Sequence, residues 1–312
     1  MVAPKYVGLC GSDVSYARKG RNGSFIVEHP FVLGHEIVAQ TTSTVEVAGE
    51  TLPEGTVVAV HPLWPCPRPG ESTPREEDAA EPTRFLGSAS TRPHTNGGLA
   101  ELVAVRPEQL RRLPSGLEPR TAALAEPLAV VLHAIGRLPL SLAGRDVLVC
   151  GAGPIGLLAV VVACARGARR VVVTDLHERP ARLAVDLGAS DSILVGHDAP
   201  LIDAVDVAIE ASGAPASLGA GLDALRPGGC LLQLGMLPPE LTLHPAPLIT
   251  KELTVVGSHR FAGELDDALA FLAEHPECAR IITHEVPLEE AERAIDLAAD
   301  PTTSKVVVRV GG

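Results

Sequence analysis

The amino-acid sequence predicts an α/β protein in which a doubly wound parallel sheet stands beside a second, β-rich domain. Three observations predict this class. Short apolar runs alternate with helix-periodic segments over residues 146–234. Strand-like runs before residue 118 are instead separated by loops rich in proline and glycine. With 312 residues, of which 46% are hydrophobic, the chain is long enough to build two cores.

The middle of the chain carries the regular alternation of strands and helices. Strands are predicted at residues 146–150, 170–175, near Ile193, at 205–210 and at 230–234. Helices are predicted at residues 154–166, 179–187 and 216–225, the last ending at the Arg-Pro-Gly-Gly turn that starts at residue 226. Helical connections of this length imply right-handed crossovers and a parallel sheet covered on both faces. The connection after Ile193 is short, so we expect one crossover helix to be missing or reduced.

The two ends of the chain together predict the β-rich domain. Strands are predicted at residues 36–40, 57–61 and 100–105, and the proline-rich residues 65–82 are interpreted as an exposed loop. After residue 251 the pattern predicts a strand (251–256), helices near 264–274 and 288–299, and a closing strand (305–310). This tail contains elements that the β-rich domain needs. We therefore predict a discontinuous domain of residues 1–124 and 259–312, with residues 125–258 between them.

Composition excludes several classes of function. The formal net charge of −12 argues against a nucleic-acid partner, because phosphate binding needs clustered Lys and Arg. The most apolar stretch, residues 155–165, is too short to cross a bilayer, and no signal segment opens the sequence. We therefore expect a cytoplasmic protein without a membrane partner. The six cysteines lie far apart, which is not typical of a disulfide framework.

A glycine-rich turn after the first strand of the central region predicts a dinucleotide site. The segment Gly151-Ala-Gly-Pro-Ile-Gly156 leads directly into a predicted helix. The first glycine permits the tight turn, the second lets the backbone approach a pyrophosphate, and the third allows close helix–strand packing. The helix N-terminus then offers free N–H groups to phosphate. This is the Rossmann pattern, and its predicted cofactor-binding residues are Gly151, Gly153, Pro154, Ile155, Gly156, Asp175 and Arg179.

Asp175 bears on the choice of cofactor. It ends the second strand, where a carboxylate accepts hydrogen bonds from the adenosine ribose diol. A carboxylate there repels a 2′-phosphate, so NAD is favoured over NADP. Arg179 is near in sequence and leaves NADP as an alternative.

Three short segments predict a metal site. They are Cys10-Gly-Ser12-Asp13, Gly34-His35-Glu36 and Glu126-Pro-Leu. Thiolate, imidazole and carboxylate together form a zinc ligand set that leaves a position open for water or substrate. Taken singly, each segment is more often structural, since a lone cysteine usually lies in a core. Their occurrence together before a dinucleotide motif favours the metal.

These segments also carry a resemblance to a known family. The sequence resembles the zinc-containing medium-chain dehydrogenases, specifically the polyol branch with sorbitol and L-idonate 5-dehydrogenases, over nearly its whole length. The shared motifs are Gly-Leu-Cys10-Gly-Ser-Asp, Pro30-Phe-Val-Leu-Gly-His35-Glu, Arg84-Phe-Leu-Gly-Ser-Ala, Pro93-His94 with Gly97-Gly98, Ala125-Glu126-Pro-Leu-Ala-Val and Val172-Val-Thr-Asp175. Residues 84–98 look most like the L-idonate 5-dehydrogenases. The resemblance implies a GroES-like fold for the β-rich domain.

The resemblance implies a role for each residue of the metal site. Cys10, His35 and a glutamate hold one catalytic zinc, with Glu126 and Glu36 as the two alternatives for that glutamate. The resemblance also implies that Asp13 fixes the orientation of His35, that Ser12 takes the proton of the substrate hydroxyl, and that Arg260 contacts the polyol or aldonate. A surface salt bridge is the alternative interpretation of Arg260.

The implied reaction is oxidation of a secondary hydroxyl of a sugar acid or polyol, with zinc as Lewis acid and NAD as hydride acceptor. The first candidate for the substrate is L-idonate, which would be oxidised to 5-keto-D-gluconate. One alternative is that the substrate is another polyol or a cyclitol. The other alternative is that the protein is an NAD-binding relative without catalysis. The resemblance further implies a homodimer or homotetramer.

Three departures from the family pattern lead to further expectations. Many relatives carry four cysteines for a structural zinc, and the matching positions here are Cys66, Pro69, Ser72 and Ala80. We therefore expect no structural zinc. Ser15 stands where polyol relatives have a relay histidine, so we expect a different proton route and an altered pH dependence. The sequence begins close to Cys10, so strands that precede this segment in relatives are expected to be missing.

Overall fold

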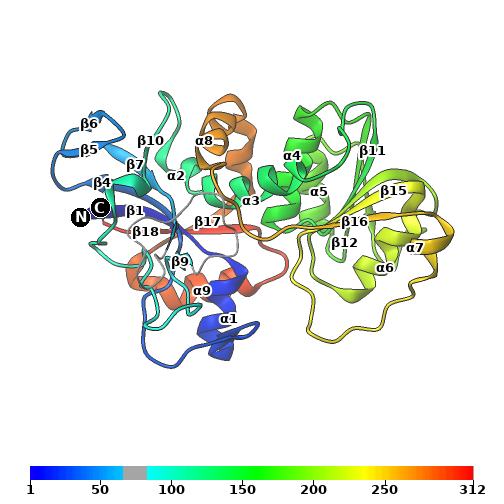
Figure 1. Ribbon diagram of the computed structural model, residues 1–312, viewed down its shortest axis with the longest axis horizontal. Helices are drawn as coiled ribbons and strands as arrows, with labels where there is room; N and C mark the ends of the chain where they lie inside the picture. Colours follow the sequence, from blue (N-terminus) through cyan, green and yellow to red (C-terminus); the bar gives the residue numbers. More distant parts are fainter. Residues whose placement is uncertain (66–82, 312) are drawn as a thin grey trace.

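The computed structural model describes residues 1–65 and 83–311, and in that part of the chain two six-stranded sheets lie side by side (Figure 1). One sheet is parallel throughout and has the strand order β13-β12-β11-β14-β15-β16. This is the 3-2-1-4-5-6 order of the doubly wound dinucleotide fold. The predicted fold class is therefore confirmed.

The elements of this nucleotide sheet follow the predicted alternation closely. Its strands are β11 (Asp146–Cys150), β12 (Arg170–Asp175), β13 (Asp191–Leu194), β14 (Val205–Glu210), β15 (Leu225–Gln233) and β16 (Thr254–Gly257). Its helices are α4 (Pro154–Ala165), α5 (Glu178–Asp186), α6 (Pro215–Ala224) and α7 (Ala246–Thr250). Between β13 and β14 the described chain has no helix, as the short connection predicted.

Strand β11 shows why an uninterrupted apolar run is needed at the centre of this sheet. All five of its residues are buried. Val147 and Val149 belong to the core that contains α4, whereas Leu148 and Cys150 belong to the core that contains α6. Successive side chains of a strand point to opposite faces, so a strand covered on both sides has no polar face.

The second sheet has the order β10-β7-β4-β1-β18-β17 and combines the two ends of the chain (Figure 1). Its strands are β1 (Val2–Gly8), β4 (Glu36–Thr41), β7 (Val57–Val60), β10 (Leu110–Arg112), β17 (Ile282–Pro287) and β18 (Lys305–Arg309). Three two-stranded ribbons are β2 (Arg21–Asn22) with β3 (Phe25–Ile26), β5 (Val45–Val47) with β6 (Glu50–Leu52), and β8 (Leu63–Pro65) with β9 (Thr83–Phe85). The exact boundaries of the two predicted domains, residues 1–124 with 259–312 and residues 125–258, stay a prediction.

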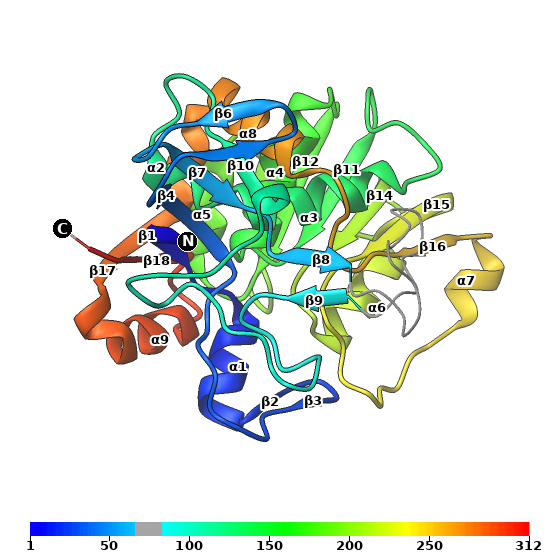
Figure 2. The ribbon, with the colours of Figure 1, turned by 60° about the vertical axis from the view of Figure 1, so that its left-hand side comes forward.

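The helices around the second sheet bring distant segments together. They are α1 (Gly11–Lys19), α2 (Pro119–Ala122), α3 (Ala125–Gly136), α8 (Leu265–Glu274) and α9 (Ala291–Ala299), with 3₁₀ turns η1 (Pro107–Gln109), η2 (Pro276–Ile281) and η3 (Leu288–Glu290). Helices α1 and α9 lie side by side (Figure 2), joined by an ion pair between Arg18 and Asp296. No helix of the described residues is both long and apolar enough to span a bilayer.

Some predicted elements were wrong. Residues 100–105 form no strand, because the preceding residues bond to the loop before β4 instead: Gly97 N donates to Val32 O and Leu99 N to Leu33 O. Only Val103 then makes a bridge, to Val2. Strand β15 begins at Leu225 rather than residue 230, with an irregular register after its first pair.

Among the elements that the prediction omitted, β1, α1 and α3 lie nearest to the predicted metal site. Strand β1 lies between β4 and β18, in the middle of the second sheet. Its sequence contains Pro4 and a register shift between Pro4 and Tyr6, which hide the strand pattern. Helix α3 follows directly on residue 124 and has seven buried residues, so it lacks the polar face that marks a surface helix.

Asp146 holds three elements of the nucleotide sheet together and gives a testable stability prediction. Its carboxylate accepts hydrogen bonds from Arg169 (2.6 and 2.9 Å) and from Arg226 (2.9 Å). These arginines lower the pKa of Asp146 to about 2. Because the Arg169 side chain is 62% exposed, we expect Asp146→Asn to lower the free energy of unfolding at pH 7 by about 1 to 2 kcal/mol.

The pH dependence follows from the sign of this shift. A carboxyl whose folded pKa is depressed stabilises the fold above its unfolded pKa, near 4, and loses that effect as the pH falls towards 2. Urea unfolding of the unsubstituted protein and of Asp146→Asn at pH 7, 5 and 3 measures this. We expect the difference between their free energies of unfolding to be smaller at pH 3 than at pH 7. Asp191→Asn is the control, because its pair with Arg170 is long (4.0 Å) and exposed. A pH-independent difference would contradict the assignment.

Candidate functional site

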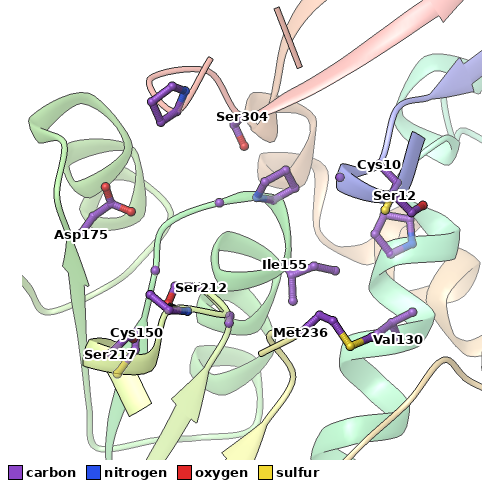
Figure 3. Close-up of a pocket in the computed structure, with 18 of the residues that line it drawn as sticks. Cys10, Ser12, Val130, Cys150, Ile155, Asp175, Ser212, Ser217, Met236 and Ser304 are labelled. Atoms are coloured by element: carbon purple, nitrogen blue, oxygen red, sulfur yellow. Dashed lines mark hydrogen bonds between the residues drawn. The ribbon is translucent and has the colours of Figure 1, made fainter. Parts of the chain in front are cut away.

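A single cavity of about 1180 Å³ joins the two predicted sites (Figure 3). At one end it is lined by all the predicted metal ligands, Cys10, His35, Glu36 and Glu126, together with Ser12 and Arg260. At the other end it is lined by Gly151, Gly153, Pro154, Ile155 and Asp175. The two sets of residues therefore face one space, as chemistry between a cofactor and a metal-bound substrate requires.

The pairing of β1 with β4 brings the metal-site residues together. These strands are antiparallel, with Gly8 opposite Glu36. Cys10, two residues after the end of β1, therefore comes close to His35, the residue before β4. The ligand atoms of Cys10, His35 and Glu36 all lie within 4.8 Å of one another. A thiol, an imidazole and a carboxylate at this spacing are a donor set that suits zinc.

Asp13 lies behind this cluster and is fully buried. Its carboxylate accepts hydrogen bonds from the backbone N–H of Cys10 (2.9 Å) and of Gly34 (3.0 Å), one from each segment that carries a ligand. Its Oδ1 is 3.8 Å from Nδ1 of His35, on the side of the ring where an orienting carboxylate would stand. Asp13 thus ties the two ligand segments to each other.

His35 shows the local electrostatics most clearly. Burial lowers the pKa of His35, but Asp13 and Cys10 raise it, and the pKa lies well above its ordinary value. Its Nδ1 is buried without a hydrogen-bond partner in the described part of the chain. An imidazole surrounded by a carboxylate and a thiol attracts positive charge, either a proton or a metal ion. The residues present therefore fit a divalent cation.

The two candidate glutamates differ in their surroundings. Glu36 is 1% exposed, and both its oxygens accept hydrogen bonds from Nζ of Lys305, at 2.5 and 2.7 Å. Glu126 lies in the first turn of α3, is 6% exposed and stands outside the 4.8 Å cluster. Burial raises the pKa of Glu126 to about 7 against the opposing effect of His35. Which glutamate binds the metal stays a prediction.

Lys305 is a site residue that the sequence reasoning missed. It is the first residue of β18, is 2% exposed, and also donates to the backbone oxygen of Leu9 (3.0 Å). The sequence does carry one signal for Lys305, because it is a single lysine at the start of a predicted apolar strand. A lysine in a buried strand is rare without an acidic partner, so its position predicts a buried ion pair. A Cβ on Gly8 would stand 1.9 Å from Glu36 Oε2, so this pair needs glycine there.

The glycine turn has the geometry that a pyrophosphate needs. Gly151 has φ +97°, which disfavours any other residue, and a Cβ on Gly156 would meet Gly151 O at 1.9 Å. A Cβ on Gly153 would meet nothing within 4 Å, so the absence of a side chain there leaves open space in front of α4. The turn therefore fits a dinucleotide phosphate group at the start of this helix.

Asp175 and Arg179 occupy different positions. Asp175 lines the cavity, and its carboxylate accepts hydrogen bonds from Ala152 N and His177 N, each 2.8 Å long. These bonds fix the carboxylate beside the glycine turn. Arg179 is exposed on α5 and is absent from the cavity lining. The structure thus brings Asp175, but not Arg179, to the predicted cofactor site.

Arg260 faces the metal end of the cavity. Its guanidinium carbon lies 4.3 Å from the centre of the Phe85 ring, and burial lowers the pKa of the guanidinium. Its backbone has φ +58°, an unfavourable value for arginine. Among the described residues it forms no ion pair, which disagrees with the surface salt bridge that was its alternative interpretation. A buried cation on an aromatic ring remains available to an anionic ligand.

Four residues of one prediction cannot be compared with the structure. Cys66, Pro69, Ser72 and Ala80, on which the predicted absence of a structural zinc rests, lie outside the described residues. Of the three cysteines inside apolar runs, which are expected to be buried as small apolar residues, Cys150 and Cys230 are 1% exposed and lie in the core, whereas Cys164 is only half-buried.

Comparisons with known proteins agree with this geometry. Residues 1–115 match the alcohol dehydrogenase GroES-like domain, and residues 154–274 match the zinc-binding dehydrogenase family. The chain is 32% identical to L-idonate 5-dehydrogenase (NAD(P)(+)) of Escherichia coli, covering 96% of this chain and 88% of that protein. It is 33% identical to sorbitol dehydrogenase of Mus musculus, covering 97% and 86%. The crystal structure of L-idonate 5-dehydrogenase from Escherichia coli superposes with a TM-score of 0.89, at 30% identity, covering 99% and 90%.

Proposed function

Because the chain belongs to the polyol branch of the zinc-binding dehydrogenases with a GroES-like domain, we propose that it oxidises a secondary hydroxyl of a sugar acid or polyol with NAD. L-idonate, oxidised to 5-keto-D-gluconate, is the substrate that we propose first. The observation that carries this proposal is the shared cavity, in which the ligand cluster of Cys10, His35 and Glu36 faces the glycine turn.

We assign the chemistry to residues as follows. Cys10, His35 and either Glu36 or Glu126 would hold one zinc ion, which supplies a Lewis acid, while NAD supplies the hydride acceptor. Ser12 lines the cavity two residues after Cys10 and would take the proton of the substrate hydroxyl. Asp13 would orient His35, which its bonds to both ligand segments support. Asp175 would bind the adenosine ribose, which favours NAD over NADP.

The test combines metal analysis with an assay of NAD reduction. We expect one zinc per chain, with no structural zinc, and NADH formation with L-idonate. Sorbitol, xylitol and a cyclitol form the comparison panel. Turnover of a neutral polyol but not of L-idonate would replace the substrate and keep the reaction class. Zinc and NADH bound without turnover of any panel member would contradict the proposed activity.

Arg260 gives the sharpest prediction about the substrate. If the guanidinium pairs with the carboxylate of an aldonate, Arg260→Ala should raise KM for L-idonate roughly 10- to 100-fold, because a charge-assisted hydrogen bond is lost. KM for a neutral polyol should change by less than about threefold, because a neutral substrate has no carboxylate for the guanidinium to pair with. Steady-state kinetics with both substrates measure this.

Arg106→Ala is the matched control for that experiment. Arg106 also lies over an aromatic ring, with 6.0 Å from its guanidinium carbon to the centre of the Trp64 ring, but it does not line the cavity. We expect this variant to leave both KM values unchanged. An equal rise in KM for L-idonate and for the neutral polyol in Arg260→Ala would speak against carboxylate recognition.

We also propose that the protein is a homodimer or homotetramer. Strand β16 is the last strand in the order of the nucleotide sheet, and Val255 within it is 50% exposed. Within the part of the chain that the structure describes, β16 pairs with β15 on one side only, and a strand edge with apolar side chains supports pairing with a second copy. Sedimentation velocity measures the assembly, and a monomer at micromolar concentration would contradict it.

A further inference from the structure

The turn between α9 and β18 contains a buried hydroxyl with no role in the site described above. Ser304 is 7% exposed and lines the cavity, yet its Oγ has no hydrogen-bond partner in the described part of the chain. Figure 3 shows its side chain directed into the cavity from the side opposite the glycine turn. A buried hydroxyl is normally hydrogen-bonded, so one directed into an open cavity indicates a ligand.

The backbone of this turn is held in place. Ser304 N donates to Thr283 Oγ1 (3.2 Å), and the next residue, Lys305, is anchored on Glu36. Just before it, Thr303 Oγ1 donates to the backbone oxygens of Leu297 (2.6 Å) and Asp300 (2.9 Å). The backbone that carries the Ser304 side chain is therefore fixed before any ligand arrives, which reduces the entropy that binding would cost.

Across the cavity stands the N-terminus of α4, a helix of 12 residues. Its first N–H groups lack partners within the helix and carry a partial positive charge. Gly153 leaves open space in front of them. An anion in this space would have the helix on one side and the Ser304 hydroxyl on the other.

We propose that Ser304 donates a hydrogen bond to the pyrophosphate of the dinucleotide, opposite the N-terminus of α4. This inference rests on the NAD binding proposed above and adds a contact from the other sheet. Since β18 also carries Lys305, the cofactor would be held by the same segment that pairs with Glu36. Asp300, on the same turn, is exposed, so solvent and salt screen its negative charge from an anion in the cavity.

Isothermal titration calorimetry of the full chain tests the proposal with NADH, ADP-ribose and adenosine. ADP-ribose keeps the pyrophosphate without the nicotinamide, and adenosine carries no phosphate. We expect Ser304→Ala to weaken NADH and ADP-ribose by the same factor, about tenfold, because a hydrogen bond to a charged group is lost. Adenosine affinity should stay unchanged. Ser304→Thr, which keeps a hydroxyl, should restore binding.

Ser258→Ala is the matched control, because Ser258 Oγ is also buried without a partner among the described residues but does not line the cavity. It should bind NADH as the unsubstituted protein does. Thermal unfolding and zinc content of each variant show whether the fold is intact. Unchanged NADH affinity in Ser304→Ala, or a loss for NADH without a loss for ADP-ribose, would overturn the assignment. A protein that binds no NADH at all would overturn the proposed function as well.

Discussion

Replacing Cys10 by alanine is expected to remove the bound zinc and to lower kcat/KM for the oxidised alcohol by at least about a thousandfold. The reason is the ligand cluster, in which the thiol is the one sulfur donor beside His35 and Glu36 within residues 1–65 and 83–311. Metal analysis by mass spectrometry and an assay of NAD reduction measure the two effects independently. NADH affinity should change little, because the glycine turn lies at the other end of the cavity.

Cys164→Ala controls for the loss of a thiol. Cys164 is half-buried on α4, and its thiol donates a hydrogen bond to Gly188 O, outside the cavity. This variant should keep its zinc and its activity. Full zinc occupancy in Cys10→Ala would mean that the glutamates and His35 bind the ion without the thiol, and the proposed ligand set would be wrong.

Replacing Lys305 by methionine is expected to lower the free energy of unfolding of zinc-free protein by about 3 to 5 kcal/mol. The pair of Lys305 and Glu36 is buried on both sides, with 3% and 1% of the side chains exposed. Removing one partner leaves a carboxylate in the interior without a counter-charge, which costs more than the pair itself contributes. Urea unfolding in the presence of a chelator measures the change without the contribution of bound metal.

Two further variants make this result interpretable. Glu36→Gln combined with Lys305→Met should recover part of the loss, because no unpaired charge remains in the interior. Arg182→Met, which breaks the exposed pair with Glu178, should cost less than about 0.5 kcal/mol. If Lys305→Met were as mild as Arg182→Met, water would have to reach Glu36, contrary to its burial.

The nucleotide sheet could be predicted because its evidence is local. Strand β11 and the glycine turn after it occupy consecutive residues, and apolar runs of five or six residues mark strands covered on both faces. The positions of Gly151, Gly153 and Asp175 follow from this short segment. All three line the cavity, and their binding of a dinucleotide stays a prediction.

The metal end was predicted less completely, because its contacts join distant parts of the chain. Cys10, His35, Glu36 and Glu126 were recognised through motifs, and they do line one cavity. Their partner Lys305 was not, since it is 269 positions from Glu36 and no local pattern links them. The strand predicted at residues 100–105 was wrong for a related reason. Apolar composition favours a strand there, but the loop before β4 supplies competing hydrogen bonds.

The adjacency of β1 and β18 also determines the order in which the two halves can mature during synthesis. The nucleotide sheet uses residues 146–257 only, so a nascent chain can complete it while the last strands are still within the ribosome. The second sheet has to wait for β18, which pairs with β1 and brings Lys305 to Glu36. Until then Glu36 lacks its counter-charge, so we expect the ligand cluster to take up its metal only after β18 has paired with β1.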